Sequence, residues 1–175
     1  MPAAGAAVSI APHRFGLAPP GRPAPPWTTQ AWFNTSADLK LADLLGSVVV
    51  LHAFQMLCPA CVLHGLPQAQ RVHVTFAGQG VAVIGLHTVF EHHAAMTPVS
   101  LQAFLHEFRI TFPVGVDAPG SDVHDPVPVT MRAYGLQGTP SLVLIDRRGH
   151  LRHHAFGAED DLGLGAAIAT LLVQA

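Results

Sequence analysis

The residues best able to carry chemistry are Cys58 and Cys61, which are the only cysteines in the 175-residue chain. Two residues separate them, and a C-x-x-C pair can alternate between a dithiol and a disulfide. The apolar run 48–54 precedes the pair and has the β-branched composition of a strand buried on both faces. A single pair of cysteines with this spacing at a strand-to-helix junction indicates redox chemistry.

The start of the expected helix gives the two thiols different roles. Unpaired backbone N–H groups and the helix dipole stabilise a thiolate at a helix N-terminus, so we expect Cys58 to be the nucleophile. Cys61 lies one turn deeper on the same side, where it can attack a mixed disulfide at Cys58 and release the partner. Pro59 suits the first turn, which needs no backbone donor.

The elements around this junction predict an α/β fold. Strands alternate with helices up to residue 116, and after a short helical turn a hairpin and a last helix follow. This order predicts a central mixed β-sheet flanked by helices on both faces. Thr97 as N-cap and Pro98 at the first helical position predict where one helix begins. The expected strands are 32–33, 48–54, 81–86, 112–116, 141–145 and 150–156, and the expected helices are 58–76, 97–108, 130–134 and 160–173.

Composition excludes several classes of protein. Half of the residues are hydrophobic, 11% are charged and the net charge is −2, which is typical of a folded domain without a basic patch. We therefore expect no nucleic-acid binding and no membrane binding. No apolar run reaches the roughly 18 residues that a membrane-spanning helix needs. The twelve histidines accompany a single lysine, and we expect them mostly at the surface or the core edge, with metal capture as the alternative.

Proline density divides the chain into two parts. Residues 1–26 are rich in Ala, Pro and Gly, which disfavours helix and sheet, so we expect an extended or partly disordered N-terminal arm. Residues 27–175 are expected to form a single domain, with Trp27 and Trp32 fixing the end of the arm to it. The segment 1–10 has neither a basic region nor a sustained apolar region of a secretory signal, so we expect a cytoplasmic protein.

A second stretch, Gly138-Thr139-Pro140, precedes the strand 141–145 and the turn 146–149. Together with Cys58-Pro-Ala-Cys61, it makes the chain resemble the thioredoxin-like superfamily over about residues 27–175. The most similar branch is that of the redoxins, which comprises TlpA/ResA-like thiol–disulfide oxidoreductases and their AhpC/TSA (peroxiredoxin) relatives.

The resemblance implies a thioredoxin-like fold and a thiol–disulfide oxidoreductase. It implies that the Thr139-Pro140 bond is cis and faces the disulfide, and that the backbone at Thr139 pairs with the bound substrate segment. The expected partners are protein or small-molecule disulfides and dithiols, together with an external electron donor. No organic cofactor is expected.

The sequence departs from the family pattern at three positions. Leu57 stands where the family usually has Trp, which should change partner docking more than the exchange chemistry. Pro67 is six residues after Cys61, whereas the family proline is typically five residues after, so an extra residue or a bulge is expected near Gly65. His52 stands where thioredoxins often bury an Asp, and a buried His can move protons to or from Cys61 near neutral pH. The alternative is a core histidine without a chemical role.

Two further residues follow the strand 81–86. His87 and Glu91 resemble a stretch of redoxin-type domains in which an acidic residue tunes the site, and strand ends in open α/β sheets point into the ligand crevice. We therefore consider both as supporting residues, with ordinary loop residues as the alternative.

Two other functions remain open. A thiol peroxidase is one, although Gln55 occupies the position at which typical peroxiredoxins carry Thr. Metal handling is the other, since Cys58, Cys61 and His64 supply two thiolates and an imidazole on successive helical turns, suited to copper or zinc.

Overall fold

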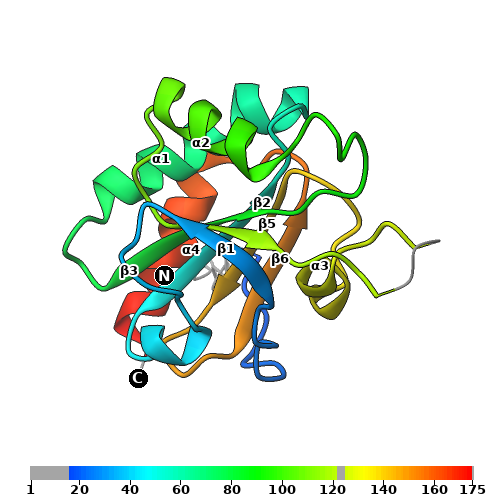
Figure 1. The fold of residues 1–175 in the computed structure, drawn as a ribbon. Coiled ribbons are helices and arrows are strands. Elements are labelled where there is room, and N and C mark those ends of the chain that lie inside the picture. Colours follow the sequence, from blue (N-terminus) through cyan, green and yellow to red (C-terminus); the bar gives the residue numbers. More distant parts are fainter. Residues whose placement is uncertain (1–15, 122–124, 175) are drawn as a thin grey trace, which may run out of the picture.

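The computed structural model describes residues 16–121 and 125–174. These residues form a mixed six-stranded sheet in the order β1-β4-β3-β2-β5-β6 (Figure 1). β2, β3 and β4 are parallel neighbours, whereas β1, β5 and β6 pair antiparallel. The strands are β1 (Thr29–Phe33), β2 (Val48–Phe54), β3 (Val81–His87), β4 (Val114–Asp117), β5 (Ser141–Ile145) and β6 (Leu151–Phe156), and the α-helices are α1 (Leu66–Thr75), α2 (Pro98–Glu107), α3 (Val129–Tyr134) and α4 (Asp161–Val173).

Helices cover both faces of the sheet, which confirms the expected architecture. The helices α1, α2 and α4 pack on one face (Figure 1), where Val48, Val50 and Phe54 of β2 share one hydrophobic cluster with residues of these helices, among them Leu66, Leu101 and Ile168. α3 packs on the opposite face, together with a short 3-10 helix, Leu41–Leu44, and the end of the N-terminal arm. Because β2 is buried along its whole length, it can be apolar on both faces. Within the described residues, no helix is long and apolar enough to cross a membrane.

The described part of the arm, 16–26, is extended and runs along β6. The N–H of Ala18 donates to the carbonyl of Arg152 at 2.7 Å, and that of Ala24 donates to Gly149 at 2.8 Å. Trp27 fixes the end of the arm, since its indole N–H donates to the carbonyl of Leu39 at 2.6 Å. The described residues do not include 1–15 or 122–124. The predicted absence of a secretory signal concerns residues 1–10 and therefore lies outside the described residues. The domain boundary near residue 27 stays a prediction.

Most element ends follow the capping signals of the sequence. Thr97 caps α2 by accepting a hydrogen bond from the N–H of Ser100, as expected. Asp160 caps α4 in the same way, through the N–H of Gly163. The largest differences from expectation are in two strands, since β1 begins at Thr29 and β4 spans Val114–Asp117, whereas β3 and β6 each differ by one residue at one end. Long-range pairing between these two strands, which local pattern does not encode, sets both ends.

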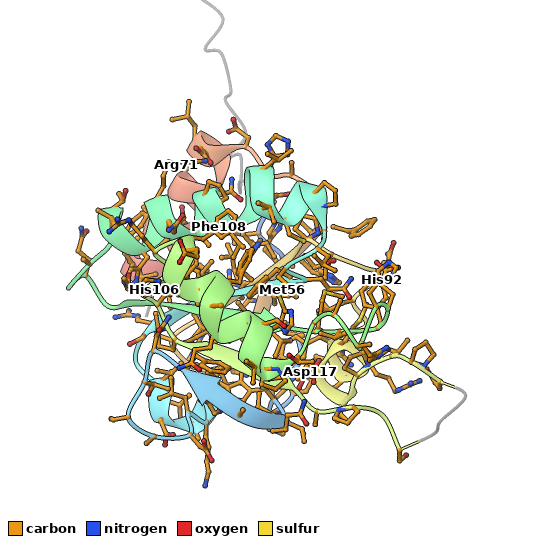
Figure 2. The ribbon with its side chains drawn as sticks, turned by 45° about the horizontal axis from the view of Figure 1, so that its top comes forward. Met56, Arg71, His92, His106, Phe108 and Asp117 are labelled. Carbon is orange, nitrogen blue, oxygen red and sulfur yellow. The ribbon has the colours of Figure 1, made fainter. Side chains whose placement is uncertain are left out.

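A buried carboxylate links α3 to the sheet, and no local sequence pattern indicates this contact. Asp117, at the end of β4, accepts hydrogen bonds from the N–H groups of Thr130 and Met131 at 2.8 and 2.9 Å, so it caps the first turn of α3 (Figure 2). The hydroxyl of Thr88 donates to it at 3.0 Å. Burial raises the pKa of Asp117, and these hydrogen bonds oppose the rise.

The helix that carries the cysteines contains one wide turn. Residues 59–60 are helical, Cys61–Gly65 form a π-helical turn, and α1 follows. The N–H of Leu66 donates to the carbonyl of Cys61, five residues earlier, so the turn holds one extra residue. This confirms the bulge expected between Cys61 and Pro67. It also places Pro67 in the first turn of α1, where a residue without an N–H loses no helical hydrogen bond.

Two histidines lie in the core on the α1 side of the sheet. His52 in β2 and His87 at the end of β3 are 2% and 1% exposed, and within the described residues no ring nitrogen of either has a hydrogen-bond partner. Phe54 lies between them, with ring centroids 6.4 Å from His52 and 5.3 Å from His87. Burial disfavours the charged form and lowers the pKa of each ring to about 4.

These two rings predict a loss of stability in mild acid. Between pH 6.5 and 4 the unfolded chain binds protons that the folded chain excludes, so the stability present above pH 6.5 falls as the pH decreases. We expect each ring to remove roughly 3 kcal/mol from the free energy of unfolding by pH 4. Urea denaturation at pH 7.5, 6.0, 5.0 and 4.5 measures this loss.

His87→Leu should make that pH dependence shallower, since it removes one titrating ring. His106→Gln is the matched control because His106 is exposed on α2 and should leave the slope unchanged. Equal slopes for wild type, His87→Leu and His106→Gln would contradict the explanation.

The wide turn also predicts a steric effect at Gly65. A Cβ added there would lie 2.5 Å from Cε1 of His52 and 3.1 Å from Cβ of Pro140, so the surroundings must shift. We expect Gly65→Ala to lower the free energy of unfolding by about 1–3 kcal/mol. Gly165→Ala in α4 is the control, because its Cβ would meet nothing within 4 Å and should stabilise the helix by up to about 1 kcal/mol. Destabilisation of equal size at both positions would contradict the steric argument.

Candidate active site

The two cysteines lie where β2 leaves the sheet and the helix begins. Cys58 is partly exposed and Cys61 is fully buried, and the structure holds both as free thiols. The backbone N–H of Cys61 donates to Sγ of Cys58 at 3.3 Å. A donor in this position stabilises negative charge on Cys58, as expected for a sulfur at a helix N-terminus.

Cys61 is the less solvent-exposed of the two thiols. Burial is the main reason that its pKa rises to about 12, and the neighbouring Cys58 side chain adds to the rise. Hydrogen bonding to the backbone of Gln55 and to Thr139 lowers the pKa and offsets part of this rise. Cys61 is therefore a thiol at neutral pH and needs a base before it can attack a disulfide.

Thr139 and Pro140 face the cysteines, and the bond between them is cis, as expected. The thiol of Cys58 donates to the carbonyl oxygen of Thr139 at 3.5 Å. The two stretches meet because β2 and β5 are antiparallel neighbours, with Ala53 opposite Ser141. The end of one strand thus lies beside the start of the other.

Three large apolar side chains are exposed in the segments next to the cysteines and Thr139. Leu57, Leu63 and Phe156 are 54%, 67% and 57% exposed, unusually high values for such residues. Phe156 lies over Gly138, whose added Cβ would be 2.9 Å from the ring. Leu57 was singled out in the sequence, whereas Phe156 was not, since only the β5–β6 pairing brings it to Gly138.

Gln55 is a site residue that sequence reasoning used only as a contrast to peroxidases. Its backbone carbonyl accepts from the N–H of Cys58 at 3.2 Å. Its buried side chain accepts from the N–H of Phe90 at 3.3 Å and donates to Glu91 at 3.4 Å. Glu91 is exposed and reaches the cysteine loop through this amide, whereas His87 lies in the core against Phe54.

His52 lies beneath the cysteine helix. An added Cβ at Gly65 would lie 2.6 Å from Nε2 of His52, so the ring packs against the π turn that begins at Cys61. Pro140 contacts the same glycine position. The structure thus places His52 and Pro140 against Gly65, in the turn that begins at Cys61, and leaves both ring nitrogens of His52 without a partner among the described residues.

The metal-binding alternative finds no preformed site in the part of the chain that the structure describes. No group of three or more His, Cys, Asp or Glu side chains there is arranged to hold a metal ion. His64 is exposed on the π turn and Cys61 is buried under it. A site at Cys58, Cys61 and His64 would therefore need the turn to rearrange.

Comparison with known proteins agrees with this geometry. A crystal structure of a thioredoxin-like superfamily protein shares 61% identity with this chain at a TM-score of 0.84, covering 87% of this chain and 97% of its own. A thiol-disulfide isomerase from Corynebacterium glutamicum shares 48% identity at a TM-score of 0.81, covering 87% and 98%. A thioredoxin-like protein in the oxidized form, at 21% identity and a TM-score of 0.70 over 87% and 95%, shares the fold.

These structures confirm the thioredoxin-like fold. A search of the curated proteins gives no significant match. The model of the AhpC/TSA family matches residues 20–154, more than half of the sequence. The chain therefore belongs to the AhpC/TSA family.

Proposed function

We propose that this thioredoxin-like thiol–disulfide oxidoreductase works through a mixed disulfide at Cys58 that Cys61 resolves. The observation that carries the proposal is the asymmetry of the two thiols. Cys58 is accessible and accepts the Cys61 N–H at 3.3 Å, whereas Cys61 is 0% exposed. Only the first can meet a protein partner, and only the second is placed to attack the bond that results.

The reaction consists of two exchanges. The Cys58 thiolate attacks a partner disulfide, forms one S–S bond with the nearer sulfur and releases the other as a thiolate. Cys61 then loses its proton and attacks Sγ of Cys58, which forms the Cys58–Cys61 disulfide and releases the reduced partner. An external dithiol returns the pair to the reduced state, and the same steps in reverse oxidise a partner.

The partner is a peptide segment that docks across Thr139 and the apolar side chains around Cys58. The carbonyl of Thr139 lies 3.5 Å from Cys58, so a segment joined to that sulfur lies beside this backbone. Leu57, Leu63 and Phe156 offer apolar contact area that the protein itself leaves exposed. Leu57 in place of an indole gives a smaller and more flexible contact than the usual family residue.

His52 accepts the proton that Cys61 loses. Burial raises the pKa of the Cys61 thiol and lowers that of the His52 imidazole, so the resting state holds the proton on sulfur. Both groups therefore rest neutral in the core and carry charge only during exchange.

A thiol peroxidase remains the second candidate, because the AhpC/TSA family match covers residues 20–154. Gln55, which replaces the usual Thr, uses its amide to bind Phe90 and Glu91. Hydrogen peroxide consumption at rates far above those of a free thiol, lost in Cys58→Ser, would favour this candidate.

The mixed disulfide can be trapped. In Cys61→Ala the resolving sulfur is absent, so a disulfide-bonded peptide should remain attached to Cys58 at least about 100-fold longer than in the wild type. Mass spectrometry after acid quenching measures the adduct. Cys58→Ala is the control and should form no adduct at Cys61, because that thiol is buried. A stable adduct at Cys61, or rapid release from Cys61→Ala, would overturn the assignment of roles.

The role of His52 predicts a change in the pH profile of resolution. His52→Asn keeps a polar side chain of smaller size but removes the base, so resolution at pH 7 should slow by roughly 10- to 100-fold. The rate in the variant should rise with pH up to 9, as hydroxide replaces the imidazole. The initial attack by Cys58 should change less than twofold. Single-turnover release of a fluorescent peptide between pH 6 and 9 measures both steps, and unchanged resolution would remove His52 from the mechanism.

A further inference from the structure

A cleft opens beside the π turn and borders the apolar docking surface at Leu63. It has a volume of about 490 Å³ and lies between the π turn, the start of α1 and the loop 157–161 that leads into α4. His52 and Leu142 line its inner wall, and His64 and Ala158 line its outer part, where both are exposed. Of the described residues, neither cysteine nor Thr139 lines it.

The inner end of the cleft is a buried imidazole without a partner. His52 is 2% exposed, lines the cleft, and has two ring nitrogens for which no hydrogen-bond partner exists among the described residues. Unpaired buried polar atoms are costly, and water in a roomy cleft is the usual way to satisfy them. The same ring packs against the turn that begins at Cys61. His52 therefore lies between the π turn and the cleft.

The other charged groups of the cleft are already paired. Arg71 reaches from α1 to Asp161 in the first turn of α4 at 2.9 Å (Figure 2). Asp161 also accepts from Gln68 at 2.7 Å, and Asp160 caps α4.

Two side chains remain at the outer end. Glu159 lies 3.1 Å from His153, so its carboxylate has a partner. The structure gives His64 no hydrogen bond or ion pair within its described part. His64 is therefore an exposed imidazole at the outer end of the cleft whose ring makes no contact of this kind with the described residues.

We propose that this cleft carries protons between solvent and His52 while a partner covers Cys58, with His64 as the exchanging group at its outer end. The inference rests on the proposed function, because it concerns the step in which Cys61 resolves the mixed disulfide. It adds a route and a second histidine, His64, to that step. Neither Cys58 nor Thr139 lines the cleft, so the route to His52 is separate from the sulfur that the partner covers.

In the resolving direction, one S–S bond replaces another and Cys61 loses a proton. Cys61 forms an S–S bond to Cys58 while the bond from Cys58 to the partner breaks, and the partner leaves as a thiolate. The proton of Cys61 moves to one nitrogen of His52, and the other nitrogen gives its proton to water in the cleft. His64 takes that proton and releases it to solvent. In the opposite direction the cleft delivers the proton that Cys61 needs when the disulfide is reduced.

Filling the cleft tests the route without touching either cysteine or His52. Ala158→Trp places an indole in the outer part of the cleft, and we expect single-turnover resolution at pH 7 to slow by about 10-fold. Ala103→Trp is the matched control, since Ala103 is exposed on α2 and does not line the cleft. Attack by Cys58 on a disulfide peptide, measured in the same experiment, should be unchanged in both variants.

His64→Gln is a second, milder test that keeps the helix surface polar. It should slow resolution about 3-fold, and added imidazole should restore His64→Gln but not Ala158→Trp, whose cleft is closed.

Resolution within twofold of wild type in both Ala158→Trp and His64→Gln would overturn the cleft as a proton route. In that case trapping in Cys61→Ala would still support the proposed function, whereas failure to trap would remove the function itself. A slowing in Ala103→Trp equal to that in Ala158→Trp would also overturn the route, since it would show a general effect of an added indole.

Discussion

The antiparallel pairing of β2 with β5 is the constraint on which the site depends. It sets Ala53 opposite Ser141, so the chain leaving β2 toward Cys58 lies beside the chain entering β5 from Pro140. The contact of Cys58 with the carbonyl of Thr139, 81 residues away, follows from that register. β3 extends the same edge because Phe54 pairs with His87, which brings the following loop to Gln55. A shift of one residue would turn these side chains to the opposite face.

Burial on one face of this sheet then decides the electrostatics. Cys61, His52 and His87 lie on the side covered by α1 and α2, together with Phe54. In this dry region desolvation is the largest cause of each pKa shift, and it favours the neutral form of every group. Cys58 lies at the edge of the region and keeps access to solvent. The two thiols of one short motif thus differ in chemistry because Cys58 is accessible to solvent and Cys61, one helical turn later, is buried.

The sequence predicted the elements and the two cysteines well because their signals are local. β-branched runs, the cap at Thr97 and the spacing of Cys58 and Cys61 are each contained in a short window. The extra residue before Pro67 even indicated the wide turn. Contacts between distant segments carry no such signal, which is why the amide of Gln55 bound to Phe90 and Glu91, and the ring of Phe156 over Gly138, were missed.

A histidine at position 52 suits this core better than a carboxylate would. A carboxylate without a partner must either remain protonated or bury a charge at a cost of several kcal/mol. A neutral imidazole has an acceptor and a donor on opposite sides of the ring, so it can take a proton on one side and release one on the other. The packing of His52 against the π turn on one side and the cleft on the other makes use of that property. The departure from the usual family residue is therefore consistent with the unpaired ring, the lowered pKa and the adjoining cleft.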